Sequence, residues 1–139
     1  MMNEQENVQV VQNLFAAFGQ GNIPAALDIL AEDVDWQSPV RRTRPGKISW
    51  ATPRHGHKEV AEFSKELSEK MQIERMETLD FTAQGDRVVV EGKNRGTVKS
   101  TGRTYEHDWV MVFTVRGGKV VRHRHYYDTA DIAVAFRSQ

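Results

Sequence analysis

Hydrophobic residues in the first half of the chain recur with the period of a helix. The first stripe ends at two glycines and consists of Val8, Val11, Leu14, Phe15 and Phe18. Asn22 and Pro24 predict the start of a second, shorter helix, since proline suits the first turn. A third helix is predicted to begin near His57, and its apolar stripe consists of Val60, Phe63, Leu67 and Met71. Residues 39–56 have no periodicity and are expected to form a long loop.

From Leu79 onward the period changes to two, which is typical of β-strands. Turn signals at QGD, STG and RGG divide this half into four predicted strands, residues 79–83, 87–99, 103–116 and 119–128. Helices followed by a meander of antiparallel strands predict an α+β fold, with helices on one face of a curved sheet. A length of 139 residues with 39% hydrophobic residues fits a single domain, residues 1–139, with one core.

Charged side chains indicate which face of each strand meets water. Odd positions of the second predicted strand carry charges, so the even positions face inward: Val88, Val90, Gly92, Asn94, Gly96 and Val98. In the last strand Arg122 and Arg124 mark the outer face. Alternation then directs the other residues of this strand inward: Val121, His123, His125 and Tyr127.

The turn before the last strand decides which inward residues are neighbours. A three-residue turn at Arg116-Gly117-Gly118 is favoured, because a two-residue Gly-Gly turn would flip the middle strand. The predicted inner rows are Val90–Met111–His123, Gly92–Trp109–His125 and Asn94–His107–Tyr127. Strand glycines leave space, and polar groups converge beside aromatic walls, so this end of the sheet is predicted to hold a ligand pocket.

Charge and composition narrow the classes of partner. Lys plus Arg number 19 and Asp plus Glu number 19, so nothing in the balance favours nucleic acid or an anionic membrane. The absence of cysteine excludes a disulfide, a thiol nucleophile and a cysteine–zinc site. The sequence contains no apolar run long enough to span a bilayer and no secretory leader pattern, so a cytoplasmic location is expected.

Three stretches resemble the SnoaL-like branch of the nuclear-transport-factor-two-like superfamily. They are LFAAFGQGNIPAALDILAEDVDWQSP, GHKEVAEFSKEL and TGRTYEHDWVMVFTVRGGKVVRHRHYYD. The resemblance implies a cone-shaped, bent antiparallel sheet around N-terminal helices, an internal pocket and a two-fold dimer. Related epoxide hydrolases use an Arg-x-Asp pair where this chain has Gly92 and Asn94, and an aspartate where it has His125. Epoxide hydrolysis is therefore not expected.

The candidate catalytic residues are His125, His107, Asn94 and Tyr127. Imidazole titrates near neutrality, so His125 is the candidate proton carrier, and the other three would polarise a substrate oxygen. The competing interpretation is a histidine that only hydrogen-bonds a neighbour. The expected ligand-binding residues are Trp36, Ser38, Trp50, Phe63, Leu67, Met71, Val90, Trp109, Met111 and His123.

The function favoured by these residues is cofactor-independent isomerisation, cyclisation or dehydration next to a carbonyl. The alternative is a ligand-binding or dimerisation domain without catalysis. A zinc site on His107, His123 and His125 is a minor alternative, and no metal or cofactor is expected. The ligand is expected to be a small, partly apolar molecule, and a carboxylate if the basic segment 39–56 covers the pocket.

Three further expectations concern the surroundings of the pocket. Trp50 should anchor segment 39–56 across the open end, and deleting residues 41–52 should remove few core contacts. Asp128, like Asp131, closes the last strand and is expected to cap a turn or helix. Outward apolar residues predict a dimer through the outer sheet face: Val89, Val110, Val112 and Val120.

Overall fold

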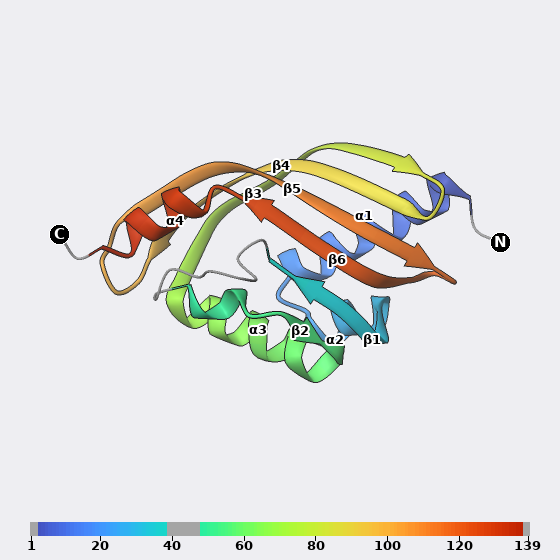
Figure 1. The fold of residues 1–139 in the computed structure, drawn as a ribbon, viewed down its shortest axis with the longest axis horizontal. Helices are drawn as coiled ribbons and strands as arrows, with labels where there is room; N and C mark the ends of the chain where they lie inside the picture. Colours follow the sequence, from blue (N-terminus) through green and yellow to red (C-terminus); the bar gives the residue numbers. More distant parts are fainter. Residues whose placement is uncertain (1–2, 39–47, 138–139) are drawn as a thin grey trace.

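A curved sheet is the frame on which the other elements lie (Figure 1). The computed structural model describes residues 3–38 and 48–137. Within them the strands are β1 (Leu30–Gln37), β2 (Arg54–His55), β3 (Met71–Gln84), β4 (Arg87–Val98), β5 (Thr104–Arg116) and β6 (Lys119–Tyr127). They form one sheet in the order β2-β1-β6-β5-β4-β3, in which β1 runs parallel to β6 and the other neighbours are antiparallel.

Helices cover one face and one end of this sheet (Figure 1). Their bounds are α1 (Glu4–Gly19), α2 (Ile23–Ile29), α3 (Gly56–Lys70) and α4 (Thr129–Ala135), with a short 3-10 turn η1 (Ser49–Ala51). Asn3 caps α1 by accepting a hydrogen bond from Glu6 N–H, and Asn22 caps α2 by accepting one from Ala25 N–H. No helix in the described part of the chain is both long and apolar enough to cross a bilayer.

The three predicted helices are confirmed, and the strand after α3 is longer than predicted. β3 begins at Met71, immediately after α3, rather than near Leu79. Ile73, Met76 and Leu79 are exposed on this edge strand, so no buried alternation marks it in the sequence. Met71, predicted as the last residue of the helical stripe, is instead the buried first residue of β3.

Two further elements were not predicted as such. The extended segment around Trp36 is strand β1, which pairs with β6 as the single parallel contact among the described strands. Helix α4 follows β6 directly and packs against β5. Asp128 is its N-cap and accepts a hydrogen bond from Asp131 N–H at 3.0 Å, so the predicted capping role is confirmed.

The predicted faces and register of β4 are confirmed. Asn94 pairs with His107, Gly92 with Trp109 and Val90 with Met111. The residues predicted to face inward are buried or, for Asn94, partly buried. On β6, neither Arg122 nor Arg124 borders the interior cavity described below. Arg124 is nevertheless covered, because its guanidinium donates a 2.7 Å hydrogen bond to the Asp35 carboxylate of β1.

The predicted pairing of β5 with β6 is wrong by two residues. The turn has two residues, Gly117 and Gly118, with φ of 57° and 79°, and it joins paired Arg116 and Lys119. Such a turn needs positive φ at both positions, which glycine adopts without strain. Without a compensating irregularity, this two-residue turn would place the side chains of β6 on the opposite faces of the sheet from those predicted. The register shift after Val120 leaves one extra residue on β6, a β-bulge that restores the alternation.

Because of the bulge, two valines face the opposite way from the prediction, and three pocket residues have different neighbours on β5 than predicted. Val120 is buried in the core, so its predicted place on the outer face is wrong, as is the inward facing of Val121. The observed pairs are Phe113 with His123, Met111 with His125 and Trp109 with Tyr127. A shift by two residues preserves which face each side chain occupies, so the histidines still point inward.

The strand glycines do not leave empty space, contrary to the sequence-based expectation. A Cβ on Gly92 would lie 2.1 Å from Trp109 Cζ2 and 2.3 Å from the backbone oxygen of Glu77. A Cβ on Gly96 would lie 2.2 Å from the Tyr105 hydroxyl. An aromatic ring from β5 therefore covers each glycine of β4, an arrangement that fills the gap and helps to fix strand register.

The close fit at Gly92 predicts that Gly92→Ala destabilises the fold. The new methyl group would meet both a buried ring and a backbone oxygen, so the free energy of unfolding should fall by about 1–3 kcal/mol. Urea denaturation measures this change. Gly19→Ala is the control, since a Cβ there has no neighbour within 4 Å. Equal stability of Gly92→Ala and the wild type would contradict the packing described.

Candidate functional site

The concave face of the sheet and helices α1 and α3 enclose a cavity of about 960 Å³. This volume lies at the upper end of the range of about 300–1,000 Å³ typical of small-molecule sites. Most of its wall is apolar and comes from α1, α3, β1 and β5: Leu14, Phe15, Phe18, Trp36, Phe63, Leu67, Met111 and Phe113. The cavity therefore suits a ligand with a substantial apolar body.

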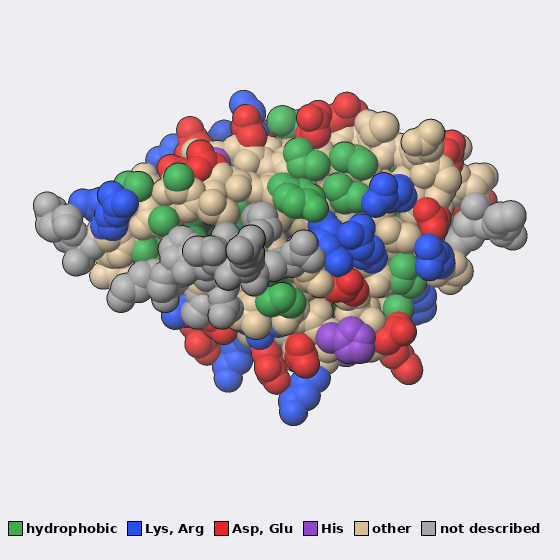
Figure 2. All heavy atoms as spheres, in the orientation of Figure 1, with side chains coloured by type: hydrophobic (Ala, Val, Ile, Leu, Met, Phe, Trp, Pro, Cys, Tyr) green, Lys and Arg blue, Asp and Glu red, His purple; other side chains and the backbone are tan. Residues whose placement is uncertain are grey.

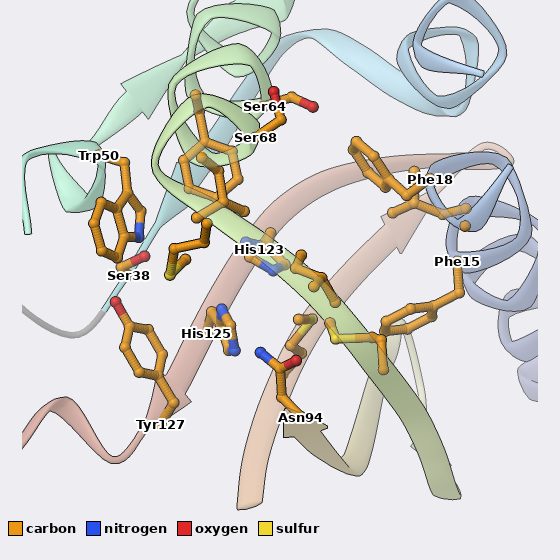
Figure 3. Close-up of a pocket in the computed structure, with 18 of the residues that line it drawn as sticks. Phe15, Phe18, Ser38, Trp50, Ser64, Ser68, Asn94, His123, His125 and Tyr127 are labelled. Atoms are coloured by element: carbon orange, nitrogen blue, oxygen red, sulfur yellow. The ribbon is translucent and has the colours of Figure 1, made fainter. Parts of the chain in front are cut away.

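One wall of the cavity is polar, and it is built by three neighbouring strands. β4 contributes Asn94, β5 contributes His107, and β6 contributes His123, His125 and Tyr127. In Figure 3 the labelled members of this wall, Asn94 and the three β6 residues, lie opposite the ring of Phe18. These five side chains border the same cavity.

Many polar atoms of this wall are buried and unpaired. Among the described residues, those without a hydrogen-bond partner include Asn94 Oδ1, His123 Nδ1 and Nε2, and His125 Nε2, together with Trp36 Nε1. A buried polar group without a partner costs on the order of 1–3 kcal/mol. Several such atoms on one cavity wall are a set of donors and acceptors arranged for a polar molecule.

His123 lies deepest and is held by an aromatic neighbour. Its ring stacks on Trp36 with a centroid distance of 3.7 Å, and the residue is 1% exposed. Burial lowers the pKa of His123 well below its usual range, and the nearby His125 and Arg124 act in the same direction. His123 is therefore a neutral hydrogen-bonding group.

His125 lies between His123 and Tyr127 along the wall. Its ring centroid is 6.1 Å from that of His123 and 4.7 Å from that of Tyr127. Burial, reinforced by the charge of nearby His107, lowers the pKa of His125 to about 3. The sequence-based argument assumed an imidazole that titrates near neutrality, and this assumption is wrong for His125 in the ligand-free protein.

Tyr127 lies at the end of the cavity formed by β1 and η1. Its hydroxyl faces the Ser38 hydroxyl and the Trp50 indole nitrogen (Figure 3). Burial raises the pKa of Tyr127, while hydrogen bonding from Ser38 and Trp50 acts in the opposite direction. Tyr127 is thus a protonated phenol that can donate its hydrogen to a ligand oxygen.

His107 differs from the other two pocket histidines because it faces a carboxylate. Its Nδ1 lies 2.9 Å from Asp131 Oδ2, a residue of α4. The His107 ring also stacks between Tyr105 and Tyr127, with centroid distances of 5.5 and 5.8 Å. Asp131 was expected only to close the last strand, and its contact with His107 is the main feature that the sequence analysis missed.

Two residues expected to touch ligand do not border the cavity. Val90 is 0% exposed within the core, and the Trp109 ring stacks on Phe15 over Gly92. Val90 and Trp109 both belong to the hydrophobic core that packs around the cavity. The other expected ligand-binding residues border the cavity: Trp36, Ser38, Trp50, Phe63, Leu67, Met71, Met111 and His123.

Trp50 is part of a second hydrophobic cluster at the α4 end of the sheet. It packs against Phe136 at a centroid distance of 5.4 Å, and its neighbours Ile48 and Ala51 are buried too. The expectation that residues 41–52 contribute little to the core is therefore wrong for 48–51. Residues 39–47, where this expectation also placed the basic side chains, lie outside the described residues.

The histidines do not form a recognisable metal site. In the part of the chain that the structure describes, no three His, Cys, Asp or Glu side chains are grouped closely enough to hold an ion. The nearest approach to such a group joins His107 to a carboxylate, whereas His123 and His125 have ring centroids 6.1 Å apart. The polar wall is better described as a row of hydrogen-bonding groups.

Comparison of the sequence with models of protein families identifies the family of this chain. A family model described as a SnoaL-like domain matches residues 11–123. The chain belongs to the SnoaL-like family. No curated protein matches the sequence significantly.

Solved structures similar to this SnoaL-like protein cover nearly its whole length. An NTF2-like protein from Burkholderia xenovorans LB400 is 42% identical with a TM-score of 0.87, covering 99% of this chain and 100% of that one. An NTF2-like protein of unknown function from Burkholderia pseudomallei K96243 is 28% identical with a TM-score of 0.84, covering 96% and 98%. TerC, co-crystallised with polyporic acid, is 27% identical with a TM-score of 0.81, covering 94% and 97%.

The two neutral histidines predict that the SnoaL-like protein loses stability in mild acid. The lowered pKa values of His123 and His125 mean that the unfolded chain binds more protons than the folded protein below about pH 6.5. The free energy of unfolding should therefore decrease as the pH is lowered, by at most about 1.4 kcal/mol per pH unit for each histidine. Urea denaturation between pH 7 and pH 4.5 measures the slope.

Substitution separates the contribution of one histidine from general acid effects. His125→Gln removes one titrating group, so its stability should depend less steeply on pH than that of the wild type. His55→Gln is the matched control, because His55 is exposed on the opposite side of β1 from the cavity wall. The interpretation fails if His125→Gln and His55→Gln have the same slope.

Proposed function

We propose that this SnoaL-like protein binds a small, partly apolar molecule in the cavity and transfers a proton next to its carbonyl group. The observation that carries the proposal is the row of unpaired polar atoms on β4 and β6, facing an otherwise apolar cavity. A ligand with oxygen atoms along one edge would satisfy them, while its apolar body would contact the rings of α1 and α3.

The polar wall has the groups needed to stabilise charge on an oxygen. Tyr127 carries its hydroxyl proton, and the Asn94 side chain supplies an amide elsewhere on the same wall. Donors fixed in a dry cavity stabilise a developing enolate more strongly than the same donors in water. Isomerisation, cyclisation and dehydration next to a carbonyl all form an enolate, so all three reactions require stabilisation of its negatively charged oxygen.

Two independent points support a small-molecule ligand. TerC, which is 27% identical over 94% of this chain, was co-crystallised with polyporic acid. The cavity volume of about 960 Å³ also suits a molecule of drug-like size. Lys65 and Arg75 border the cavity with exposed side chains, and they favour a ligand with a carboxylate or another acidic group near the entrance.

The proposal extends to assembly and location. Val110, Val112 and Tyr126 lie on the outer face of β5 and β6, where hydrophobic side chains gather beside basic ones in Figure 2. Tyr126 is 49% exposed, and a second copy related by a two-fold axis would cover this surface. Homodimer formation and a cytoplasmic location both stay predictions.

Deuterium uptake tests the proposed chemistry. The protein should catalyse exchange of the acidic α-hydrogens of 2-tetralone, an aryl-fused cyclic ketone, in deuterated buffer, as followed by proton NMR. Tyr127→Phe removes the donor to the oxygen and should slow exchange about 10–1,000-fold. Ser100→Ala, in the exposed turn between β4 and β5, is the control and should exchange at the wild-type rate.

The same experiment distinguishes an enzyme from a binding domain. Binding of small ketones, measured by calorimetry, without any exchange across a panel of aryl and cyclic ketones would favour the non-catalytic alternative. Absence of both binding and exchange would contradict the proposed function altogether.

The dimer prediction rests on the outer face and is tested separately. Light scattering should give a dimer at micromolar concentration for the wild type and a monomer for the double variant Val110→Glu, Tyr126→Glu. Leu79→Glu is the control, since Leu79 is 56% exposed on β3, at the sheet edge farther from β6. A monomeric wild type, or a double variant that stays dimeric, would refute the predicted interface.

A further inference from the structure

The Asp131 carboxylate is held in a fixed position at the start of α4. Its Oδ2 accepts hydrogen bonds from His107 Nδ1–H at 2.9 Å and from Glu106 N–H at 3.0 Å. Its own backbone N–H donates to the capping carboxylate of Asp128 at 3.0 Å. The two hydrogen bonds to Oδ2 therefore fix the carboxylate against the sheet, and the acidic group lies at a helix N-terminus, where negative charge is favoured.

This contact determines which nitrogen of His107 carries the proton. A carboxylate accepts and cannot donate, so Nδ1 must be protonated, and in the neutral ring the lone pair lies on Nε2, on the opposite edge. Stacking between Tyr105 and Tyr127, with interplanar angles of 27° and 20°, prevents the ring from tilting freely. His107 borders the cavity, so a base of defined tautomer stands in its wall.

We propose that His107 is the proton-carrying catalytic residue of this site and that Asp131 is its positioning residue. This inference rests on the proposed function and deepens it by replacing His125 in the role of acid and base. The Asp131 carboxylate holds the ring in its tautomer and balances the positive charge that forms when Nε2 takes a proton.

The surroundings of the other two histidines exclude them from this role. In the described part of the chain, His107 has as neighbours Tyr105 and Glu106 on β5, His125 and Tyr127 on β6, Asn94 on β4 and Asp131 on α4. Among the described neighbours, no carboxylate reaches His123 or His125. Two imidazolium ions in one wall would repel each other, so at most one of these histidines carries a proton at a time, and the Asp131 carboxylate makes His107 the one that does.

The step is balanced without a cofactor. His107 Nε2 takes a hydrogen from the carbon next to the carbonyl, the C–H bond breaks, and its electron pair moves into the C–C bond as the carbonyl oxygen becomes an enolate. Tyr127 Oη–H donates to that oxygen. The imidazolium then returns the proton as the enolate re-forms the carbonyl. In a β,γ-unsaturated ketone the proton goes to the γ-carbon of the dienolate and gives the conjugated isomer; in a β-hydroxy ketone the C–O bond breaks and the proton goes to the departing hydroxyl, giving water and an α,β-unsaturated ketone.

Kinetics of 2-tetralone exchange tests the pair. Asp131→Asn preserves an acceptor for Glu106 N–H but removes the charge, and it should lower the maximal exchange rate by at least about tenfold and up to 10⁴-fold, with little change in KM. Asp131→Glu should recover part of the rate, because the charge is restored. His125→Gln should mainly raise KM, because His125 then only binds the ligand oxygen.

Asp128→Ala is the matched structural control. It removes the N-cap of α4 and one hydrogen bond to Asp131, at a cost of about 1 kcal/mol in the free energy of unfolding. Because it leaves the carboxylate against His107, the exchange rate should stay within about twofold of the wild type. A loss of rate equal to that of Asp131→Asn would instead assign Asp131 a structural role and overturn the proposal.

A measurement on the ligand-free protein separates this inference from the proposed function. Nitrogen-15 NMR of labelled histidine should find His107 with its proton on Nδ1, and Asp131→Ala should release the other tautomer. A proton on Nε2 in the wild type, or an undiminished rate in Asp131→Asn, overturns the inference alone. A wild-type protein that exchanges no hydrogen of any ketone overturns the proposed function, and the proton-carrying role with it.

Discussion

The turn and bulge between β5 and β6 are the constraint on which the site depends. Two glycines with positive φ close the turn in two residues, and by itself this would turn every side chain of β6 to the opposite face. The bulge at Val121 inserts one residue and restores the alternation. Its consequence is that His123, His125 and Tyr127 enter the cavity, while Arg124 turns outward to pair with Asp35.

Electrostatics then divides three similar histidines into two kinds. No carboxylate of the described residues pairs with His123 or His125, and desolvation keeps both rings neutral, as the lowered pKa of each indicates. His107 is equally enclosed, but Asp131 lies 2.9 Å from its Nδ1. A neutral imidazole is suited to hydrogen-bonding a ligand, whereas an imidazole with a carboxylate behind it is suited to accepting a proton and releasing it again.

For β4 the sequence was sufficient to predict both facing and neighbours, whereas for β6 it was sufficient only to predict the facing of the residues beyond the bulge. Alternating charge on β4 and β6 reports which side meets water, so the residues of the polar wall could be named. Register across β5 and β6 depended on one turn whose two possible forms the residues did not distinguish. Asp131 belongs to a short helix that follows β6, and only the path of α4 across β5 brings it to His107. Such a contact leaves no periodic signal in a single sequence.

The tight packing around the cavity strengthens the argument that its unpaired polar groups bind a ligand. Where β4 has glycines, the rings of Trp109 and Tyr105 cover them at the closest possible approach, so the fold fills small gaps efficiently. The same strands nevertheless border about 960 Å³ of unfilled volume and leave both His123 nitrogens and His125 Nε2 without partners among the described residues. Stability alone would favour apolar side chains at these positions, because each unpaired group is costly when buried. Their presence is therefore best explained by a ligand whose polar edge completes the hydrogen bonding of the wall.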